Sequence, residues 1–384
     1  MTDVTIITTL QHNVGDDFVR EGILYLLDRV LGPMRLRMIH KHLPITTRQE
    51  CSWLHGLGID RWMDGRRPGS ALRATSRLDS MLPLIPWTDK VLRSDVLVQS
   101  GAPIYWAIAD DDCSKTEWWA PLIERRWSKR AKRGPFLNLA GGTCQHYHSD
   151  ASEFASRPET LAYIRRYYDL CKLTTIRDRL STEVLRHAGR QAELLPCTSI
   201  FAVDRLGISP LPGEYVVLNF MTGGGHFAFG QPIDGKLWES RFVAFVKRFS
   251  VKNRCLLVCH DHKELAAARR LLPGVATFWS PRHEDYLRCY AKARFGIVNR
   301  VHAAFALGSL GKPSVVIGAD SRALMAGMIG LTSVFVNDAT EEWLASSAVR
   351  LEQESDRYAM EMATRKESVK ARYLELLTGA LRNH

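Results

Sequence analysis

The sequence predicts an α/β protein in which two Rossmann-like domains, each a parallel sheet flanked by helices, face each other across a cleft. Its 384 residues exceed one ordinary core and suit two domains of roughly 170–190 residues. Short β-branched runs alternate with longer helical patterns, which is typical of parallel α/β structure. Most of these runs are apolar throughout, as expected for strands covered on both faces.

The runs that predict strands divide into two sets. In the first half they are Val4–Thr9, Leu36–His40, Asp95–Gln99, Phe136–Ala140 and Leu173–Ile176. In the second half they are Tyr215–Phe220, Cys255–Cys259, Ala276–Trp279, Phe295–Val298, Ser314–Ile317 and Ser333–Val336.

Helices are predicted between these strands from caps and apolar periodicity. One covers Phe18–Leu31, and a second follows a capping box with proline at Ser156–Glu159. A third follows Arg177 and Asp178 and ends at Gly189. One long polar helix is expected from about Glu341 to Leu377.

The proline-rich and glycine-rich stretch before Tyr215 predicts the domain boundary. We expect a first domain at 1–196 on the acceptor side, a linker at 197–213 and a second domain at 214–340 on the donor side. The final segment, 341–384, is expected to pack back on the first domain, which completes a GT-B-like arrangement.

Composition restricts the class of protein. The chain has no apolar run long enough to span a bilayer, and its N-terminus lacks the pattern of a signal peptide, so we expect a cytoplasmic protein. The eight cysteines include no CxxC pair, which favours reduced thiols. The net charge of +11 favours anionic partners.

Two strand ends combine polar residues with a following helix. Asn13, Gly15 and Asp16 follow the first strand, where a glycine turn directs backbone N–H groups toward a ligand; alternatively, an aspartate there only caps the helix. Arg300 and His302 follow a later strand and offer an anion-binding fork and a titratable ring. The structural alternative pairs Arg300 with an aspartate and makes His302 a cap.

A glycine loop and two histidine clusters are weaker candidates. Gly223, Gly224 and His226 follow the strand that opens the second half, where the glycines either enclose an anion or form a turn. His260 and His262 alternate, as do Cys144, His146 and His148. Neither cluster has a familiar zinc spacing, so no metal is expected.

The segment 117–133 combines three tryptophans with six basic side chains. A basic amphipathic helix of this kind suits a peripheral contact with an anionic membrane, here its inner face. The alternative is a core-packed helix with a solvated basic end. Nucleic acid is disfavoured, because no nucleic-acid-binding module accompanies the segment.

In order and spacing, five motifs resemble the polysaccharide pyruvyl transferase family over residues 10 to 335. They are Asn13-Val-Gly-Asp16, Ser94–Gly101, Thr175-Ile-Arg-Asp178 with Ser181, Arg300-Val-His302, and Leu307–Ile317. Two positions depart from the family pattern. Gln99–Pro103 replaces a glycine cluster, and Asp320-Ser321-Arg322 stands where the family has a lysine.

The resemblance implies transfer of a pyruvyl group from phosphoenolpyruvate to a saccharide acceptor, with ketal formation and phosphate release. It implies that Arg300, with Ser321 and Arg322, holds the donor's phosphate and carboxylate, and that His302 donates the proton. Arg177 and Asp178 would face the acceptor with Gly101, and His260 would line the donor side. Phosphoenolpyruvate is a substrate here, and no cofactor is required. A lipid-linked or nucleotide-linked acceptor would also suit the positive charge.

Two other functions compete with this one. The first is a GT-B-type glycosyltransferase that uses a nucleotide sugar, which shares the two-domain shape. The second is a non-catalytic binder of an anionic glycan or nucleic acid, which the altered Gln99–Pro103 segment and the net charge keep open.

Overall fold

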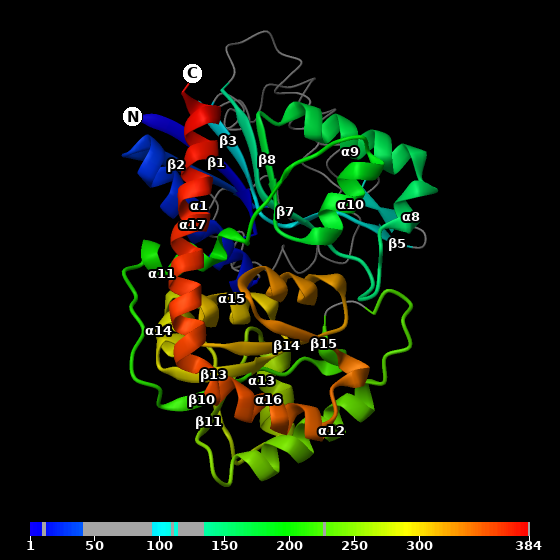
Figure 1. The fold of residues 1–384 in the computed structure, drawn as a ribbon, viewed down its shortest axis with the longest axis vertical. Coiled ribbons are helices and arrows are strands. Elements are labelled where there is room, and N and C mark those ends of the chain that lie inside the picture. The colour runs from blue at the N-terminus through cyan, green and yellow to red at the C-terminus, as the bar shows by residue number, and fades with distance from the viewer. Residues whose placement is uncertain (10–12, 41–93, 109–110, 114–133, 226–227, 383–384) are drawn as a thin grey trace, which may run out of the picture.

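The computed structural model describes residues 1–9, 13–40, 94–108, 111–113, 134–225 and 228–382, and the chain forms two parallel sheets within these ranges. The first sheet has the order β2-β1-β3-β7-β8-β9, and β4 pairs with β7. The second has the order β12-β11-β10-β13-β14-β15. Helices cover both sheets, and the two domains lie one above the other in Figure 1. The predicted fold class, two Rossmann-like domains in a GT-B-like arrangement, is confirmed.

The first domain contains short strands and helices in alternation. Its strands are β1 (Thr2–Thr8), β2 (Met34–His40), β3 (Val96–Ser100), β4 (Pro103–Tyr105), β7 (Phe136–Thr143), β8 (Leu173–Ile176) and β9 (Glu193–Leu194), with a separate hairpin of β5 (Ala107–Ile108) and β6 (Asp111–Asp112). Its helices are α1 (Val14–Leu31), α8 (Ser152–Ala155), α9 (Pro158–Leu170) and α10 (Arg179–His187), followed by η1 (Thr198–Phe201) and α11 (Ala202–Arg205).

The second domain repeats the pattern. Its strands are β10 (Tyr215–Leu218), β11 (Cys255–Val258), β12 (Ala276–Phe278), β13 (Ala293–Val298), β14 (Ser314–Gly318) and β15 (Thr332–Phe335). Its helices are α12 (Gly235–Phe249), α13 (His262–Leu271), α14 (His283–Ala291) and α15 (Val301–Ser309), with 3-10 turns η2 (Thr222–Gly224), η3 (Ser321–Ile329) and η4 (Val336–Asp338).

The strand orders place the expected ligand crevices. In an open parallel sheet, ligands bind beyond the carboxyl ends of the strands where the order reverses. The order reverses between β1 and β3 in the first sheet and between β10 and β13 in the second. The turns after these strands hold Asn13–Asp16, Gly101, Asn219–Gly225 and Asn299–His302, which include most of the residues singled out in the sequence.

The C-terminal segment joins the two domains. It forms α16 (Glu341–Gln353) and α17 (Ser355–Leu381), and the red helix α17 in Figure 1 runs along both domains. The hydroxyl of Tyr358 donates to Ile329 O in the second domain, and that of Tyr373 donates to Pro196 O in the first. Arg372 forms an ion pair with Glu193 of β9.

The structure matches all eleven predicted strands in position but differs at the helix ends. The single terminal helix is interrupted at Glu354, and the two helices part there. The capping box at Ser156 does not form: the N-cap of α9 is Arg157, without a side-chain cap. At the first helix the side chain of Asn13, and not an aspartate, accepts from Gly15 N at 3.1 Å.

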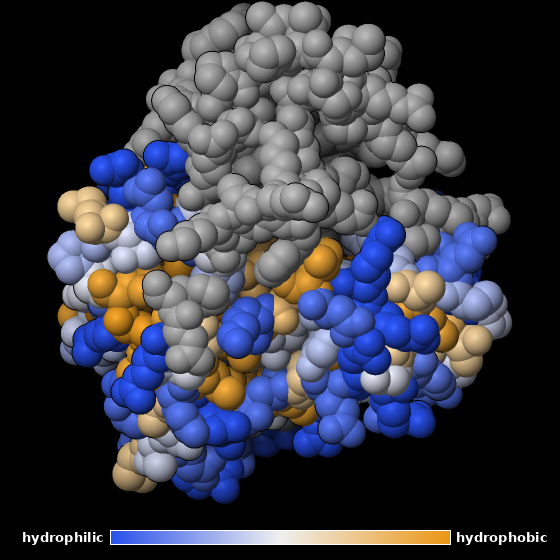
Figure 2. Space-filling model, turned by 90° about the horizontal axis from the view of Figure 1, so that it is seen from above, coloured by the Kyte–Doolittle hydropathy of each residue, from blue (hydrophilic) through white to orange (hydrophobic). Residues whose placement is uncertain are grey.

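The described helices offer no membrane span, since none of them is both long and apolar enough. Figure 2 views the molecule from the end that carries the first domain, where blue hydrophilic residues lie around and between orange hydrophobic ones. The basic segment 117–133 lies outside the described residues, as does His226.

Candidate functional site

The two domains meet at His302, in the first turn of α15. Its Nε2 lies 3.5 Å from Arg177 Nη1, which follows β8 in the first domain. Its Nδ1 lies beside Gly15 in the first turn of α1, so closely that a Cβ at Gly15 would be 2.5 Å from that nitrogen. Residues from both sheets therefore converge on one histidine, and its side chain remains partly exposed.

A second set of contacts joins the two domains. Gln145 N donates to Ser321 Oγ at 3.0 Å, and Ser321 N donates back to Gln145 O at 3.0 Å. His146 and Asp320 form an antiparallel bridge, and Tyr147 N donates to Gln231 Oε1 at 3.0 Å. The segment after β7 is thus bound to the carboxyl edge of the second sheet.

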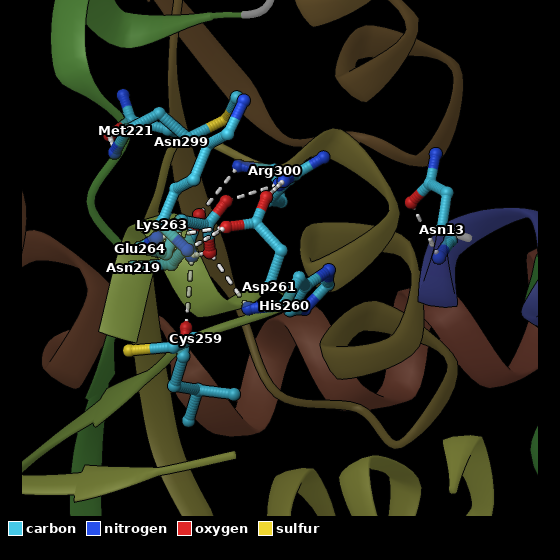
Figure 3. A network of polar contacts seen from close by, with 12 residues as sticks. Asn13, Asn219, Met221, Cys259, His260, Asp261, Lys263, Glu264, Asn299 and Arg300 are labelled. Atoms are coloured by element: carbon cyan, nitrogen blue, oxygen red, sulfur yellow. Dashed lines mark hydrogen bonds and ion pairs between the residues drawn. The ribbon is translucent and has the colours of Figure 1, made fainter. Parts of the chain in front are cut away.

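Arg300 is enclosed in a network of carboxylates and amides (Figure 3). Its Nε donates to Glu264 Oε1 at 2.6 Å and its Nη2 to Asp261 Oδ2 at 2.8 Å. Its backbone N donates to Asn219 Oδ1 at 2.9 Å. Arg300 therefore pairs with an aspartate, as the structural alternative predicted, and also with a glutamate. These two carboxylates neutralise its guanidinium.

Glu264 holds this network together. Its Oε2 accepts from Asn219 Nδ2 at 2.9 Å and from His260 N at 2.7 Å. Burial raises the pKa of its carboxyl, while Arg300 opposes that effect. The network connects the carboxyl ends of β10, β11 and β13, so it orders the turns from which His302 projects.

Arg322 also has its own counter-ion. Its Nη2 donates to Asp320 Oδ2 at 2.7 Å and its Nε to Asp320 Oδ1 at 2.8 Å, which is a bidentate pair within one turn. Its positive charge still reaches the site, where it acts on His302 and Cys144.

Arg177 differs from both of these arginines. Its side chain is 1% exposed. Its Nη1 donates to Gly101 O at 3.3 Å and lies 3.8 Å from Cys197 Sγ, while its Nε is enclosed without a partner among the described residues. No described carboxylate forms an ion pair with it, since Asp178 is engaged elsewhere.

Asp178 has a structural role in this arrangement. Its carboxylate accepts from Ser181 N at 2.7 Å and Ser181 Oγ at 2.8 Å, which caps α10. It also accepts from Thr143 N and Thr143 Oγ1, both at 3.0 Å. With four donors already bound, it has little capacity left for the acceptor hydroxyls that the resemblance assigned to it.

The pKa of His302 is lowered well below its usual value. Burial is the largest cause, followed by the positive charges of Arg177 and Arg322, and then His260 and Arg300. The ring is therefore neutral at neutral pH in the free protein. This opposes the proton-donor role that the resemblance implied.

His260 belongs to the core rather than to the cleft. It is 6% exposed, and its Nε2 lies 2.6 Å from Tyr290 Oη. Burial, with the charge of Arg300, lowers its pKa well below the usual value.

The glycine turn after β10 is closely packed. Gly223 and Gly224 both have positive φ, at 70° and 73°. A Cβ at Gly224 would be 2.6 Å from Val336 Cγ2, and one at Gly225 would be 2.9 Å from Ala319 Cβ. The glycines therefore allow the turn to lie against the ends of β14 and β15.

Two other predicted site residues, Gly101 and Asp16, contribute to strand packing and to the charge of the site. A Cβ at Gly101 would be 2.5 Å from Ala140 O, so this glycine lets β3 and β7 approach. Asp16 lies in the first turn of α1 and acts on Arg322 across the cleft. Within the described residues no three of the His, Cys, Asp and Glu side chains gather as metal ligands would.

Sequence reasoning missed several residues that define the site. Cys197 precedes η1 and lies 3.9 Å from His302 Nε2, although its sequence neighbours suggested only a linker. Gln145 was passed over between Cys144 and His146. Asp261 and Glu264 follow a strand end that was noted only for its histidines, and the acidic pair there was the available signal.

No family model and no curated protein matches the chain. Among solved structures, it resembles the UDP-GlcNAc 2-epimerase from Neisseria meningitidis bound to UDP-GlcNAc, at 11% identity over all of both chains with a TM-score of 0.53. It also resembles a putative UDP-N-acetylglucosamine 2-epimerase from Listeria monocytogenes, at 12% identity over 94% of this chain and 90% of that one with a TM-score of 0.52. The heptosyltransferase WaaC from E. coli with ADP matches at 14% identity over 91% and 99%, with a TM-score of 0.47.

These findings correct the main functional prediction. The similar structures named above with TM-scores above 0.5 are nucleotide-sugar enzymes by their titles and not pyruvyl transferases, so pyruvyl transfer from phosphoenolpyruvate is contradicted. The arginines explain the error in physical terms. Arg300 and Arg322 were assigned to the anionic donor, but carboxylates already occupy both of them.

Proposed function

We propose that the protein binds a nucleotide sugar between its two domains and transfers the glycosyl group to a saccharide acceptor. The observation that supports this most directly is the position of His302, where the carboxyl edges of two Rossmann-like sheets meet. That crevice is where nucleotides bind in open α/β sheets.

The residues around His302 suit the leaving group of such a reaction. A nucleoside diphosphate departs with added negative charge, which positive side chains and helix N-termini stabilise. Helix α15 begins at His302's own turn, and Arg177 and Arg322 add positive charge from both domains.

A second candidate is inversion of a sugar carbon within the nucleotide sugar. Two solved structures with TM-scores of 0.53 and 0.52 favour it, because their titles name UDP-GlcNAc 2-epimerases. In contrast to transfer, inversion needs no acceptor and releases no nucleotide as product.

One NMR experiment separates the two. Wild-type protein is incubated in deuterated buffer with UDP-, ADP-, GDP- and dTDP-sugars, with and without a panel of saccharides. Acceptor-dependent release of nucleoside diphosphate supports transfer, whereas acceptor-free deuterium incorporation at a sugar carbon supports inversion. Neither signal with any donor would reject both candidates.

The variant His302→Asn tests the role of His302 beside the leaving group. We expect its rate to fall by about 10²- to 10³-fold, as for loss of one group that stabilises developing negative charge. His148→Asn replaces an exposed histidine near the same cleft and is expected to keep the wild-type rate.

A further inference from the structure

The charge of Arg177 lacks a counter-ion among the described residues. Arg177 is 1% exposed, and the hydrogen-bond partners of its side chain are Gly101 O, the thiol of Cys197 and His302 Nε2. The Nε is fully buried and has no hydrogen-bond partner among the described residues. The Nη2 donates to no described residue either, but it is not fully buried. One terminal nitrogen is therefore left to donate to a ligand.

A buried arginine without a counter-ion destabilises the folded protein. A cation removed from water loses several kcal/mol of solvation, which proteins normally recover from a paired carboxylate. The same chain pairs its other two cleft arginines in this way, through Asp261, Glu264 and Asp320. Arg177 differs from them, because the carboxylate of the neighbouring Asp178 binds Thr143 and Ser181 instead.

The surroundings of Arg177 favour an oxyanion. Its Nη1 lies 3.5 Å from His302 Nε2, and the first turn of α1 lies against the other nitrogen of that ring. Helix α1 has 18 residues, and its N-terminus contributes a positive partial charge, which Asp16 and Asp17 in its first turn offset in part. A guanidinium and a histidine on one side therefore face the same small region as a helix N-terminus.

We propose that Arg177 and His302 together form an oxyanion site, which holds a phosphate or carboxylate group of a substrate and binds it with uptake of one proton. The inference does not depend on glycosyl transfer, because the site would bind an anion whatever reaction follows.

Proton uptake follows from the charges that face His302. Arg177 approaches it from the first domain, Arg322 from η3, and His260 and Arg300 from the strand ends of the second domain, and together with burial they lower its pKa. Cys197 also contacts its Nε2. An anion bound between Arg177 and His302 offsets these positive charges, so the ring becomes easier to protonate.

Two sources of the oxyanion are compatible with this chemistry: the diphosphate of a nucleotide and an acidic group on a saccharide. Calorimetric titration distinguishes them when the probes are uridine diphosphate, inorganic phosphate, glucuronate and, as the neutral control, glucose. Each titration is run near neutral pH in two buffers that differ in ionisation enthalpy. The difference in heat gives the number of protons taken up.

We expect at least one anion to bind wild type with uptake of up to one proton, and glucose to show no such effect. Strong binding of uridine diphosphate with weak binding of glucuronate would assign the site to a nucleotide, and the reverse would assign it to an acidic saccharide. If no anion binds, or if the anions bind without proton uptake, the proposal is overturned.

Variants of single residues test which side chains bind the anion and which one takes up the proton. Arg177→Met is expected to weaken anion binding by about 10- to 100-fold, as for loss of a charge-assisted hydrogen bond. Arg179→Met removes an exposed arginine two residues away and should bind as wild type does. His302→Asn should still bind the anion but take up no proton. This second variant keeps the test valid if Arg177→Met fails to fold, and unchanged binding by folded Arg177→Met would refute the proposal.

Discussion

Arg177 and Arg300 occupy corresponding places in the two domains, but their surroundings differ. Each follows a parallel strand, β8 or β13, each precedes a helix, and each is at least nine-tenths buried. Arg300 has two carboxylates and belongs to a network that orders three strand ends. Arg177 has no described carboxylate and contacts the histidine where the domains meet.

The difference shows that residue type and position do not reveal whether a buried arginine is structural or functional. Both arginines followed strand ends in the sequence, and Arg300 was assigned to the donor. The distinction depends on acidic partners that lie 36 and 39 positions away in the chain. An arginine whose charge is already paired stabilises its domain, whereas one without a counter-ion is available to a ligand.

The largest loss of stability is expected when Arg300 loses one of its two carboxylates. Glu264→Gln removes a carboxylate that Arg300, Asn219 and His260 share, and leaves a buried guanidinium only partly neutralised. We expect the free energy of unfolding to fall by about 3–5 kcal/mol, measured by urea denaturation. Glu183→Gln, which breaks an exposed pair with Arg186, should change it by less than about 0.5 kcal/mol. Equal effects in the two variants would contradict the structural role of the network.

A smaller loss is expected at the contact between the domains. In Gly15→Ala the new Cβ would lie 2.5 Å from His302 Nδ1 and 2.9 Å from His302 Cβ, so the first turn of α1 or the ring must shift. Overpacking of this kind costs about 1–3 kcal/mol. Gly274→Ala is the matched control, because nothing lies within 4 Å of its Cβ. If Gly15→Ala unfolds at the wild-type urea concentration and keeps full activity, His302 does not lie against α1.

The pH dependence of stability tests the positive surroundings of His302. Its pKa is lower in the folded protein than in the unfolded chain, so the unfolded chain binds more protons as pH falls below about 6.5. The contribution of a neutral His302 is therefore complete above that pH and declines below it, by up to about 1.4 kcal/mol per pH unit. His260 adds to this decline, because its pKa is lowered in the same direction.

Arg177→Met should make this decline level off at a higher pH than in wild type, since it removes a charge that opposes protonation of folded His302. Urea denaturation from about pH 8 down to the lowest pH at which the protein stays folded measures both curves. Curves that level off at the same pH would mean that Arg177 does not act on the histidine.

Sequence patterns sufficed for the fold because they are local. Each predicted strand is a short apolar run, and α1 and α10 follow turns with the caps Asn13 and Asp178. The meeting of the two domains at His302 also follows from topology, since strand ends face one cleft. What the patterns could not give is the pairing of charges, because Arg300 finds Glu264 only through the order of β10, β11 and β13.

The least costly substitution is expected at Arg177. Arg177→Met removes a buried charge without leaving a buried carboxylate unpaired, because no described carboxylate pairs with it. We therefore expect the free energy of unfolding to stay within about 1 kcal/mol of wild type or to rise. Arg300→Met, by contrast, leaves Glu264 and Asp261 without their partner and should cost about 3–5 kcal/mol. Urea denaturation of the two variants side by side gives the comparison directly, and a loss at Arg177 as large as that at Arg300 would show that Arg177 is structural too.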